Sequence, residues 1–507
     1  MTLTEQKTIR FAVGVMVTFM LAGCVSSEQF YEDVRLSRKT AYRQYKMRKD
    51  RERKSQPLVS GKLSLADSLR LTLANNKNLQ RVLQERQVAR GRRLGSYSAI
   101  LPDVTATAGW QEIDEVGSIT IPAFLPDSQP QEISMGDIHT YSADLTVSQP
   151  IFAGGSIPAT INAARLFSLL TDETVRAAVQ EVMYAAQSGY YDLLLSQHLA
   201  EIAADAVRSA KAGLDSVKQK RQGGVASDFD VLRAQVELSN FEAELIKNRN
   251  DIDIANANLI KIMGVSQESD FLLADQLEYV PSQVTMEEAV GAAYRNRPDL
   301  LGREFDIKYQ TELLKIVRSR YWPMVSGYYT NLWSKPDPDN RMEIEWGHSW
   351  QAGFAATLPI FDGFAREGEI IQQKARVKQA QIDLIDAEET ALFELTKAQL
   401  SIENAKRFVE SQQLNMARAK EGLRLAEVSY REGTKTQVEL IDAQVALTRA
   451  RVNYYQAIHS HTMAKLALQK AMGTLATVET VVPEADGGDR ESVALAGSST
   501  RGQNEDR

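Results

Sequence analysis

The chain has 507 residues, with 59 basic and 66 acidic side chains and a formal net charge of −7. Apolar residues make up 43% and charged residues 25%, which is the ordinary composition of a folded protein. This balance argues against a nucleic-acid-binding protein, and the length alone would suggest about two to four domains.

The first 23 residues have the pattern of an export signal. Lys7 and Arg10 precede an apolar run at residues 11–22, and small residues follow it. This run is too short to cross a bilayer as a helix, which needs about 20 residues. We therefore predict a signal peptide at residues 1–23 that is removed on export.

The only cysteine, Cys24, directly follows this signal in the sequence LAGC at residues 21–24. This sequence resembles the lipobox of bacterial lipoproteins, which implies that Cys24 becomes the acylated N-terminus. A single cysteine makes no internal disulfide, and the alternative is a free or buried thiol in a soluble exported protein. Val25 follows, not the Asp that resembles an inner-membrane retention signal, which favours the outer membrane.

The body of the chain is an internal duplication. Residues 63–79 match residues 284–300 in residue type at an offset of 221 (284 − 63), and each segment opens with a capping box. The boxes are formed by Ser64 with Asp67 and by Thr285 with Glu288.

Further along, the offset becomes 209 and pairs Gly224 with Gly433 (433 − 224) and Gly264 with Gly473 (473 − 264). The 12-residue difference (221 − 209) lies between Pro102 and Pro150 in the first copy. We predict a first repeat at residues 61–281 and a second at residues 282–475.

Alternating apolar and polar residues predict a β-hairpin in each repeat, at about residues 103–150 and 324–359. The run at residues 344–358 exceeds the roughly 9 to 11 residues that a membrane-spanning strand needs. Tryptophans flank the strands, as interfacial aromatic girdles do: they are Trp322, Trp333, Trp346 and Trp350. A half-buried sheet of a soluble protein is the alternative.

The remainder of each repeat predicts very long helices. Residues 158–222 lack an internal proline beyond Pro158 and are rich in helix-forming residues. A helix of that length would extend roughly 100 Å. Two half-length helices, at residues 64–100 and 227–263, would lie beside it, and the second repeat has the same plan at residues 285–321, 366–431 and 437–472.

Residues 60–475 resemble the outer membrane efflux protein family, the TolC-like channels. The resemblance lies in the repeated helix starts, the strand ends QPIFAGG (149–155) and LPIFDGF (358–364), the segments RQGGVASDFDVLRAQ (221–235) and REGTKTQVELIDAQ (431–444), and the MG pairs at 263–264 and 472–473. Their order, spacing and duplication carry more weight than any single motif.

The resemblance implies a mainly α protein with a membrane β-barrel part. Three protomers would each give four strands to a 12-stranded barrel in the outer membrane, and the helices would form a periplasmic tunnel. The implied function is a passive conduit in a tripartite efflux or type I secretion system. The implied partners are two further copies of the chain, a periplasmic adaptor protein, an inner-membrane pump reached through the adaptor, and outer-membrane lipid.

The resemblance also assigns roles to two helix-to-helix tips, at about residues 222–226 and 431–436. It makes these tips the surface on which the adaptor docks, and the residues concerned are Gly223, Gly224, Val225, Ala226, Gly433 and Thr434. It makes Lys435, Glu439 and Asp442 the gate at the periplasmic entrance. The first repeat has Ala226, Asp230 and Arg233 in their places, so only the second tip carries both acids. A plain turn followed by a solvated helix face is the alternative.

We expect no enzyme, no cofactor and no metal site, because the five histidines and the single cysteine form no catalytic or metal-binding pattern. Residues 24–60 are predicted to be a lipid-anchored charged linker. Ten basic and two acidic side chains at residues 35–54 suit a solvated segment better than a contact with nucleic acid or anionic lipid. Residues 476–507 are predicted to be a disordered tail. A lipid-anchored periplasmic coiled-coil scaffold or adaptor, without a membrane barrel, is the competing interpretation of the whole chain.

Overall fold

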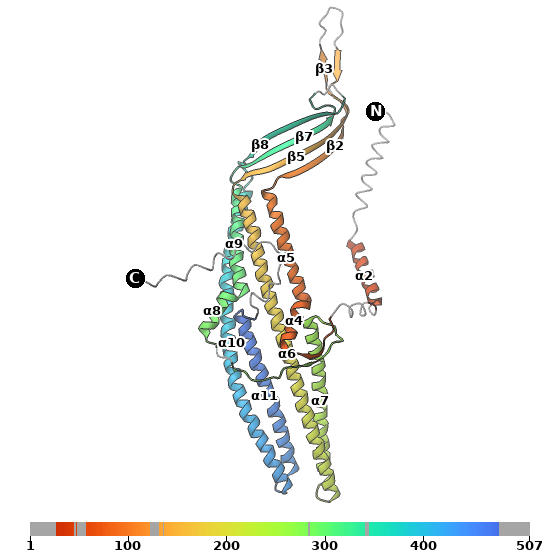
Figure 1. The fold of residues 1–507 in the computed structure, drawn as a ribbon, viewed down its shortest axis with the longest axis vertical. Coiled ribbons are helices and arrows are strands. Elements are labelled where there is room, and N and C mark those ends of the chain that lie inside the picture. Colours follow the sequence, from red (N-terminus) through yellow and green to blue (C-terminus); the bar gives the residue numbers. More distant parts are fainter. Residues whose placement is uncertain are drawn as a thin grey trace, which may run out of the picture.

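The computed structural model describes residues 27–44, 47, 57–121, 131–134, 136–281, 284–339 and 344–475. The predicted signal peptide, Cys24 and the predicted tail at residues 476–507 lie outside these ranges. The described chain forms a long, narrow rod with a curved sheet at one end and two helix-to-helix tips at the other (Figure 1).

The first repeat begins with strand β1 (Ser60–Leu63), two short helices, α4 (Leu65–Asn75) and α5 (Lys77–Gly95), and a 3-10 turn η1 (Ser96–Ala99). Strands β2 (Asp103–Glu112) and β5 (His139–Ala153) form its hairpin, with the small strands β3 (Ser118–Ile121) and β4 (Gln131–Ser134) between them. The long helix α6 (Ser156–Gln222), its partner α7 (Asp228–Met263) and strand β6 (Asp270–Leu273) complete the repeat.

The second repeat has the same plan. Helices α8 (Met286–Asn296) and α9 (Pro298–Ser319) lead to the hairpin β7 (Met324–Lys335) and β8 (Gly347–Thr357), and then to α10 (Ala365–Arg431) and α11 (Gln437–Ala471). The predicted long helices are therefore confirmed to within two residues at their ends. Ahead of both repeats stands helix α2 (Ser27–Arg43), in a segment that we had predicted only as a linker.

The two hairpins join into one antiparallel sheet in the order β2-β5-β7-β8. The register places apolar side chains of all four strands on one face, and each of these side chains is exposed: Val104, Trp110, Tyr141, Leu145, Tyr329, Trp333, Trp350 and Phe354. Small and polar residues, among them Thr105, Thr146, Thr330 and Gln351, occupy the other face. Strand β8 begins at Gly347, so our prediction that the strand starts at Ile344 was three residues too early.

Each predicted half-length helix before a hairpin is in fact two helices, and here the prediction of one continuous helix was wrong. Arg297 adopts extended backbone (ψ 118°) because it precedes Pro298, whose ring disfavours the α conformation in the residue before it. Asn76 is also extended (ψ 122°), and its side-chain oxygen caps α5 by accepting a hydrogen bond from the Leu79 N–H at 3.0 Å.

Both breaks pack directly against a glycine that ends a long-range partner helix. A Cβ on Gly264 would lie 2.4 Å from the Asn75 carbonyl oxygen, and a Cβ on Gly473 would lie 2.7 Å from the Asn296 carbonyl carbon. Gly264 and Gly473 correspond through the offset of 209, so the two repeats make the same close backbone contact. This contact explains why each MG pair of the sequence has glycine at its second position.

A short parallel pair of strands, β1 with β6, crosses the middle of the rod and was not predicted. Leu63 and Phe271 from these strands pack on Tyr190, Leu259 and Met263 in the best-buried cluster of the first repeat. The Tyr190 hydroxyl donates to Asp275 Oδ2 at 2.6 Å and lies 3.0 Å from the Leu63 carbonyl oxygen. The pair therefore ties the start and the end of the first repeat to the same turn of α6.

In the half of the rod away from the sheet, four helices lie in the row α10-α11-α6-α7 (Figure 1). Alanine is the commonest buried residue on both long helices, at 7 of 21 buried positions along α6 and 5 of 10 along α10, and it lets neighbouring helices approach closely. None of the helices in the described ranges is both long enough and apolar enough to cross a bilayer.

Candidate functional site at the helix tips

Both tips end their long helix with the same hydrogen-bonded turn. Gly224 and Gly433 have left-handed backbone (φ +77° and +76°), which glycine adopts without steric cost. The next residue then donates its N–H back to the carbonyl five residues earlier, at 2.9 Å in each tip, from Val225 and from Thr434. This is the Schellman pattern of helix ends, so the predicted glycine turns are confirmed as geometry.

A capping box opens the helix after each tip, a feature we had not predicted there. In the second tip the Thr436 backbone N–H and hydroxyl donate to Glu439 Oε2 at 2.9 and 3.1 Å, and the Glu439 N–H donates to the Thr436 hydroxyl oxygen at 3.4 Å. Ser227 and Asp230 form the same box in the first tip. The sequence signal was present, since Ser or Thr followed three residues later by an acid is its signature.

The box engages one of the two predicted gate acids. Hydrogen bonds from the backbone and hydroxyl of Thr436, helped by the nearby Lys435 ammonium, lower the pKa of the Glu439 carboxyl. Lys435 Nζ lies 3.8 Å from Glu439 Oε1 within the same protomer. Glu439 therefore stays charged and is held at the start of α11, while Asp442, one turn further on, is exposed.

Two contacts hold the tips of the two repeats together. The Lys220 ammonium lies 3.7 Å from the centroid of the Tyr430 ring, a cation–π contact between α6 and α10. Gln437 is buried and its side-chain amide donates to the Asp230 carbonyl oxygen at 3.3 Å. Lys220, Tyr430 and Gln437 also line a groove of about 520 Å³ between α6, α7, α10 and α11.

The first tip exposes large apolar side chains beside the ion pair of Arg221 with Asp228. Val225 is 80% exposed, and Phe229 and Leu232 on the first turns of α7 are also largely exposed. The second tip instead presents Thr434 and Lys435 with the acids of α11. The two tips thus share one backbone geometry and offer chemically different surfaces.

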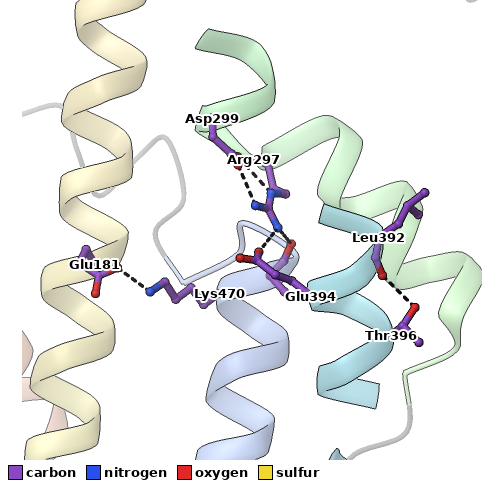
Figure 2. Close-up of polar contacts among 8 residues, drawn as sticks. Glu181, Arg297, Asp299, Leu392, Glu394, Thr396 and Lys470 are labelled. Carbon is purple, nitrogen blue, oxygen red and sulfur yellow. Dashed lines mark hydrogen bonds and ion pairs between the residues drawn. The ribbon is translucent and has the colours of Figure 1, made fainter. Parts of the chain in front are cut away.

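Halfway along the rod, the break between α8 and α9 holds a buried cation that sequence reasoning missed (Figure 2). Arg297 is only 7% exposed and donates to both oxygens of Asp299 (3.0 and 2.7 Å), to Glu394 Oε2 (2.7 Å) and to the Ala471 carbonyl oxygen (3.3 Å). Burial opposes the charge, but the hydrogen bonds to the two acids outweigh it and raise the pKa of Arg297. This set, the Arg297 clamp, joins α9, α10 and the end of α11.

The first repeat makes the corresponding contact without charge. Asn76, which corresponds to Arg297 through the offset of 221, donates its side-chain amide to the Ile262 carbonyl oxygen at 2.8 Å. The sequence offered only local signals for these two residues: Pro298 follows Arg297, and Asn76 is of a residue type that favours the N-cap. The clamp therefore adds an ionic contact to the second repeat at a position where the first has an amide.

Comparisons with known proteins agree with this architecture. A family model described as "Outer membrane efflux protein" matches residues 69–265 and 289–474. The cobalt-zinc-cadmium resistance protein CzcC of Cupriavidus metallidurans is 22% identical over 336 residues, which cover 66% of this chain and 78% of CzcC. The alkaline protease secretion protein AprF of Pseudomonas aeruginosa is 21% identical over 431 residues, covering 84% of this chain and 86% of AprF.

Solved structures show the same fold. The outer membrane protein VceC of Vibrio cholerae matches with a TM-score of 0.68 at 16% identity, over 81% of this chain and 96% of VceC. The two segments matched by the family model fall one in each repeat and together span most of the described helices and strands. The chain belongs to the outer membrane efflux protein family.

Proposed function

We propose that this protein is the outer-membrane channel of a tripartite efflux or type I secretion system, a passive conduit from the periplasm to the outside. The family is one of outer-membrane channels. The observation that carries the proposal for this chain is the exposed apolar face of its four-stranded sheet. In a soluble scaffold another layer would cover such a face, whereas a lipid bilayer suits it as it stands.

The edges of the sheet support assembly. Strands β2 and β8 are the outer strands of the four, so each has one side without a strand partner in the protomer. Unpaired backbone groups are strongly unfavourable in lipid, and closing the sheet removes them. Three copies joined edge to edge would give the predicted 12 strands (3 × 4).

The helical half supports the same assembly. Helices α7 and α10 are the outer helices of the row α10-α11-α6-α7, and each carries exposed apolar side chains along its length. On α7 these are Phe229, Leu232, Val236, Ile246 and Ile254, and on α10 they are Ile371, Ile382, Ile385, Phe393, Leu400 and Phe408. Packing α7 of one protomer against the tip-side half of α10 of the next would bury the α7 stripe together with Leu400 and Phe408, and would close a tunnel of helices.

The tips then face the periplasm and fill the roles that the family resemblance implies. The exposed apolar Val225 and the turns at Gly223, Gly224, Ala226, Gly433 and Thr434 form the docking surface for a periplasmic adaptor, which connects the channel to an inner-membrane pump. An acylated Cys24 would anchor the mature N-terminus in the outer membrane. Lys435, Glu439 and Asp442 would ring the entrance, where three copies bring six carboxylates together and favour cations.

The gate is tested with substitutions that keep the helix cap. Because Glu439 caps α11, we choose Glu439→Gln, whose amide oxygen still accepts the Thr436 hydrogen bonds, together with Asp442→Asn. In planar bilayers this double variant should retain the channel and lose cation preference. The control is Asp228→Asn with Glu242→Gln on α7, which also removes two negative charges, one of them from the ion pair of Asp228 with Arg221. Unchanged selectivity in the double variant would refute the gate assignment.

The competing function, a lipid-anchored periplasmic scaffold, makes a different prediction. A scaffold held only by its acyl group would be released from outer membranes by high salt when Cys24 is replaced by Ser. The channel would stay in the membrane and run as heat-modifiable trimers in detergent gels.

A further inference from the structure

Helix α2 takes no part in packing the rod. Every residue at positions 29–44 is exposed except Ala41, which is half-buried. In Figure 1 the helix stands apart from the rest of the molecule. It begins three residues after Cys24 (27 − 24), so its start lies within about 10 Å of chain from that residue.

One side of α2 carries an aromatic and apolar stripe. Phe30, Val34 and Ala41 follow one another at helical spacing, and Tyr31 and Tyr42 lie on the same side, with Arg38 between them and Val34. Phe30 and Val34 are 60% and 61% exposed, and Tyr42 is 83% exposed. Leu36 is the one large apolar residue of the helix off this side.

The rest of the helix is charged, with the positive side chains concentrated toward its C-terminal half. Arg35, Arg38, Lys39 and Arg43 follow the acids Glu28, Glu32 and Asp33, and Arg35 pairs with Glu32 at 3.2 Å. Six more basic residues and only two acids follow in the sequence up to residue 54. Arg35 borders the stripe beyond the tyrosines, and Asp33 borders it beyond Phe30. An aromatic stripe with arginine and lysine within and beside it is the pattern of a helix that lies in a membrane interface.

We propose that α2 lies flat on a phospholipid surface that contains anionic lipid, with Phe30 and Val34 toward the acyl chains and its basic side chains at the headgroup phosphates. The proposal rests on the proposed function in one respect: an acylated Cys24 would place α2 at the membrane. Tyrosine at the border of the stripe suits the headgroup level, and the arginine stems reach from the stripe to the phosphates. The charge of residues 35–54 alone predicted a solvated linker, and it is the exposed apolar stripe on α2 beside this charge that favours an anionic lipid surface instead.

The helix would then be a second contact between the N-terminus and the membrane, separate from the strands.

The test places a fluorescent label on each side of α2 in the full-length protein. Val34→Cys puts the label in the stripe, and Lys39→Cys, about 140° around the helix, puts it on the charged side. The proteins are reconstituted into phosphatidylcholine vesicles with or without phosphatidylglycerol, and quenching by nitroxide-labelled lipid and by aqueous iodide is compared. We expect the label at position 34 to be quenched by lipid several-fold more than the label at 39, and this difference to shrink without phosphatidylglycerol.

Charge variants sharpen the result. Arg38→Gln with Arg43→Gln should reduce lipid quenching at position 34, whereas Arg418→Gln with Lys420→Gln, an exposed pair on α10 with the same change in charge, should leave it unchanged. Equal quenching of the two labels by iodide would overturn the proposal. So would a label at 34 that is shielded from iodide but not quenched by lipid, because a protein surface would then cover the stripe.

Conductance of the same reconstituted protein tests the proposed channel function. The mass of the N-terminal peptide separately reports whether Cys24 is acylated. Lipid quenching at position 34 without conductance would keep this proposal and refute the channel. Conductance together with equal iodide quenching of the labels at positions 34 and 39 would refute the proposal for α2 and leave the channel function standing.

Discussion

Four glycines with the same backbone conformation separate the effect of conformation from the effect of packing. Gly264, Gly473, Gly224 and Gly433 have φ between +70° and +77°. A Cβ on either of the first two would meet backbone atoms of a helix break at 2.4 to 2.7 Å, whereas a Cβ on Gly224 or Gly433 would meet nothing within 4 Å. Alanine at all four positions therefore tests how closely the breaks pack on the rod.

The expected costs follow from these distances. Left-handed backbone disfavours alanine by about 1–2 kcal/mol, and this term is common to all four variants. At Gly264 and Gly473 the backbone must also move apart, and overpacking of this kind adds about 1–3 kcal/mol. We expect losses of about 1–2 kcal/mol for the two tip glycines and about 2–5 kcal/mol for the two glycines at the breaks.

The assay is the denaturant midpoint at which the helical circular dichroism signal is lost, at one protein concentration. Midpoints are compared rather than free energies, because a trimer does not unfold in a simple two-state reaction. Asparagine provides the control, because it tolerates left-handed backbone better than alanine does. Gly224→Asn should therefore have a midpoint close to that of the unsubstituted protein, whereas Gly264→Asn should be destabilised as much as Gly264→Ala. Equal losses for all four alanine variants would refute the close contact.

Three further predictions concern the clamp and the tips. Arg297→Ala should lower the same midpoint by the equivalent of about 1.5–3 kcal/mol, because its hydrogen bonds are charge-assisted. The control Arg303→Ala removes an exposed ion pair and should cost under about 1 kcal/mol. Similar losses in the two variants would contradict a stabilising role of the clamp. The capping box of Glu439 lowers its pKa, so its stabilisation is complete above the ordinary carboxyl range and is lost as the pH falls through the lowered value. The protection factors of the second-tip amides, corrected for the intrinsic exchange rate at each pH, should therefore fall in acid, and Glu439→Gln should abolish that fall. The same fall in both proteins would exclude Glu439 as its source. Lys220→Met should loosen the contact between the tips and raise channel conductance, and an unchanged conductance would show that this contact does not hold the entrance.

Much of the fold was predictable because it depends on local periodicity. The composition of residues 158–222 predicts one continuous helix, and α6 does end at Gln222, directly before Gly223. The hairpins were predictable in the same way, since strands alternate with period two. The pairing of β5 with β7, which merges the two hairpins into one sheet, joins residues nearly 200 positions apart (Tyr141 with Lys335) and followed only from the family resemblance.

The helix breaks were missed although both had a local cause. Pro298 forces extended backbone on Arg297, and Asn76 is a good N-cap, but each break interrupts a pattern that remains apolar at helical spacing on both sides. Strands β1 and β6 were missed because a four-residue strand is too short to show a clear alternating pattern. Each forms only by pairing with the other, across 210 residues (Ser60 with Asp270).

The tips were predictable as turns, and their chemistry was predictable only in part. Lys435, Glu439 and Asp442 lie at the start of α11 as expected, yet the hydrogen bonds of Glu439 to Thr436 give this acid a structural role as well. The Arg297 clamp depends on Glu394 and Ala471, which come from helices far away in sequence. No local pattern marks such a contact.

The central claim is that the apolar face of the sheet spans a membrane around a conduit. Single-channel recording of the purified, full-length protein in planar lipid bilayers tests it most directly. We predict discrete conductance steps from trimers, with a preference for cations that Glu439→Gln with Asp442→Asn removes. Folded trimers that produce no conductance steps in the bilayer would contradict the claim and favour the periplasmic scaffold.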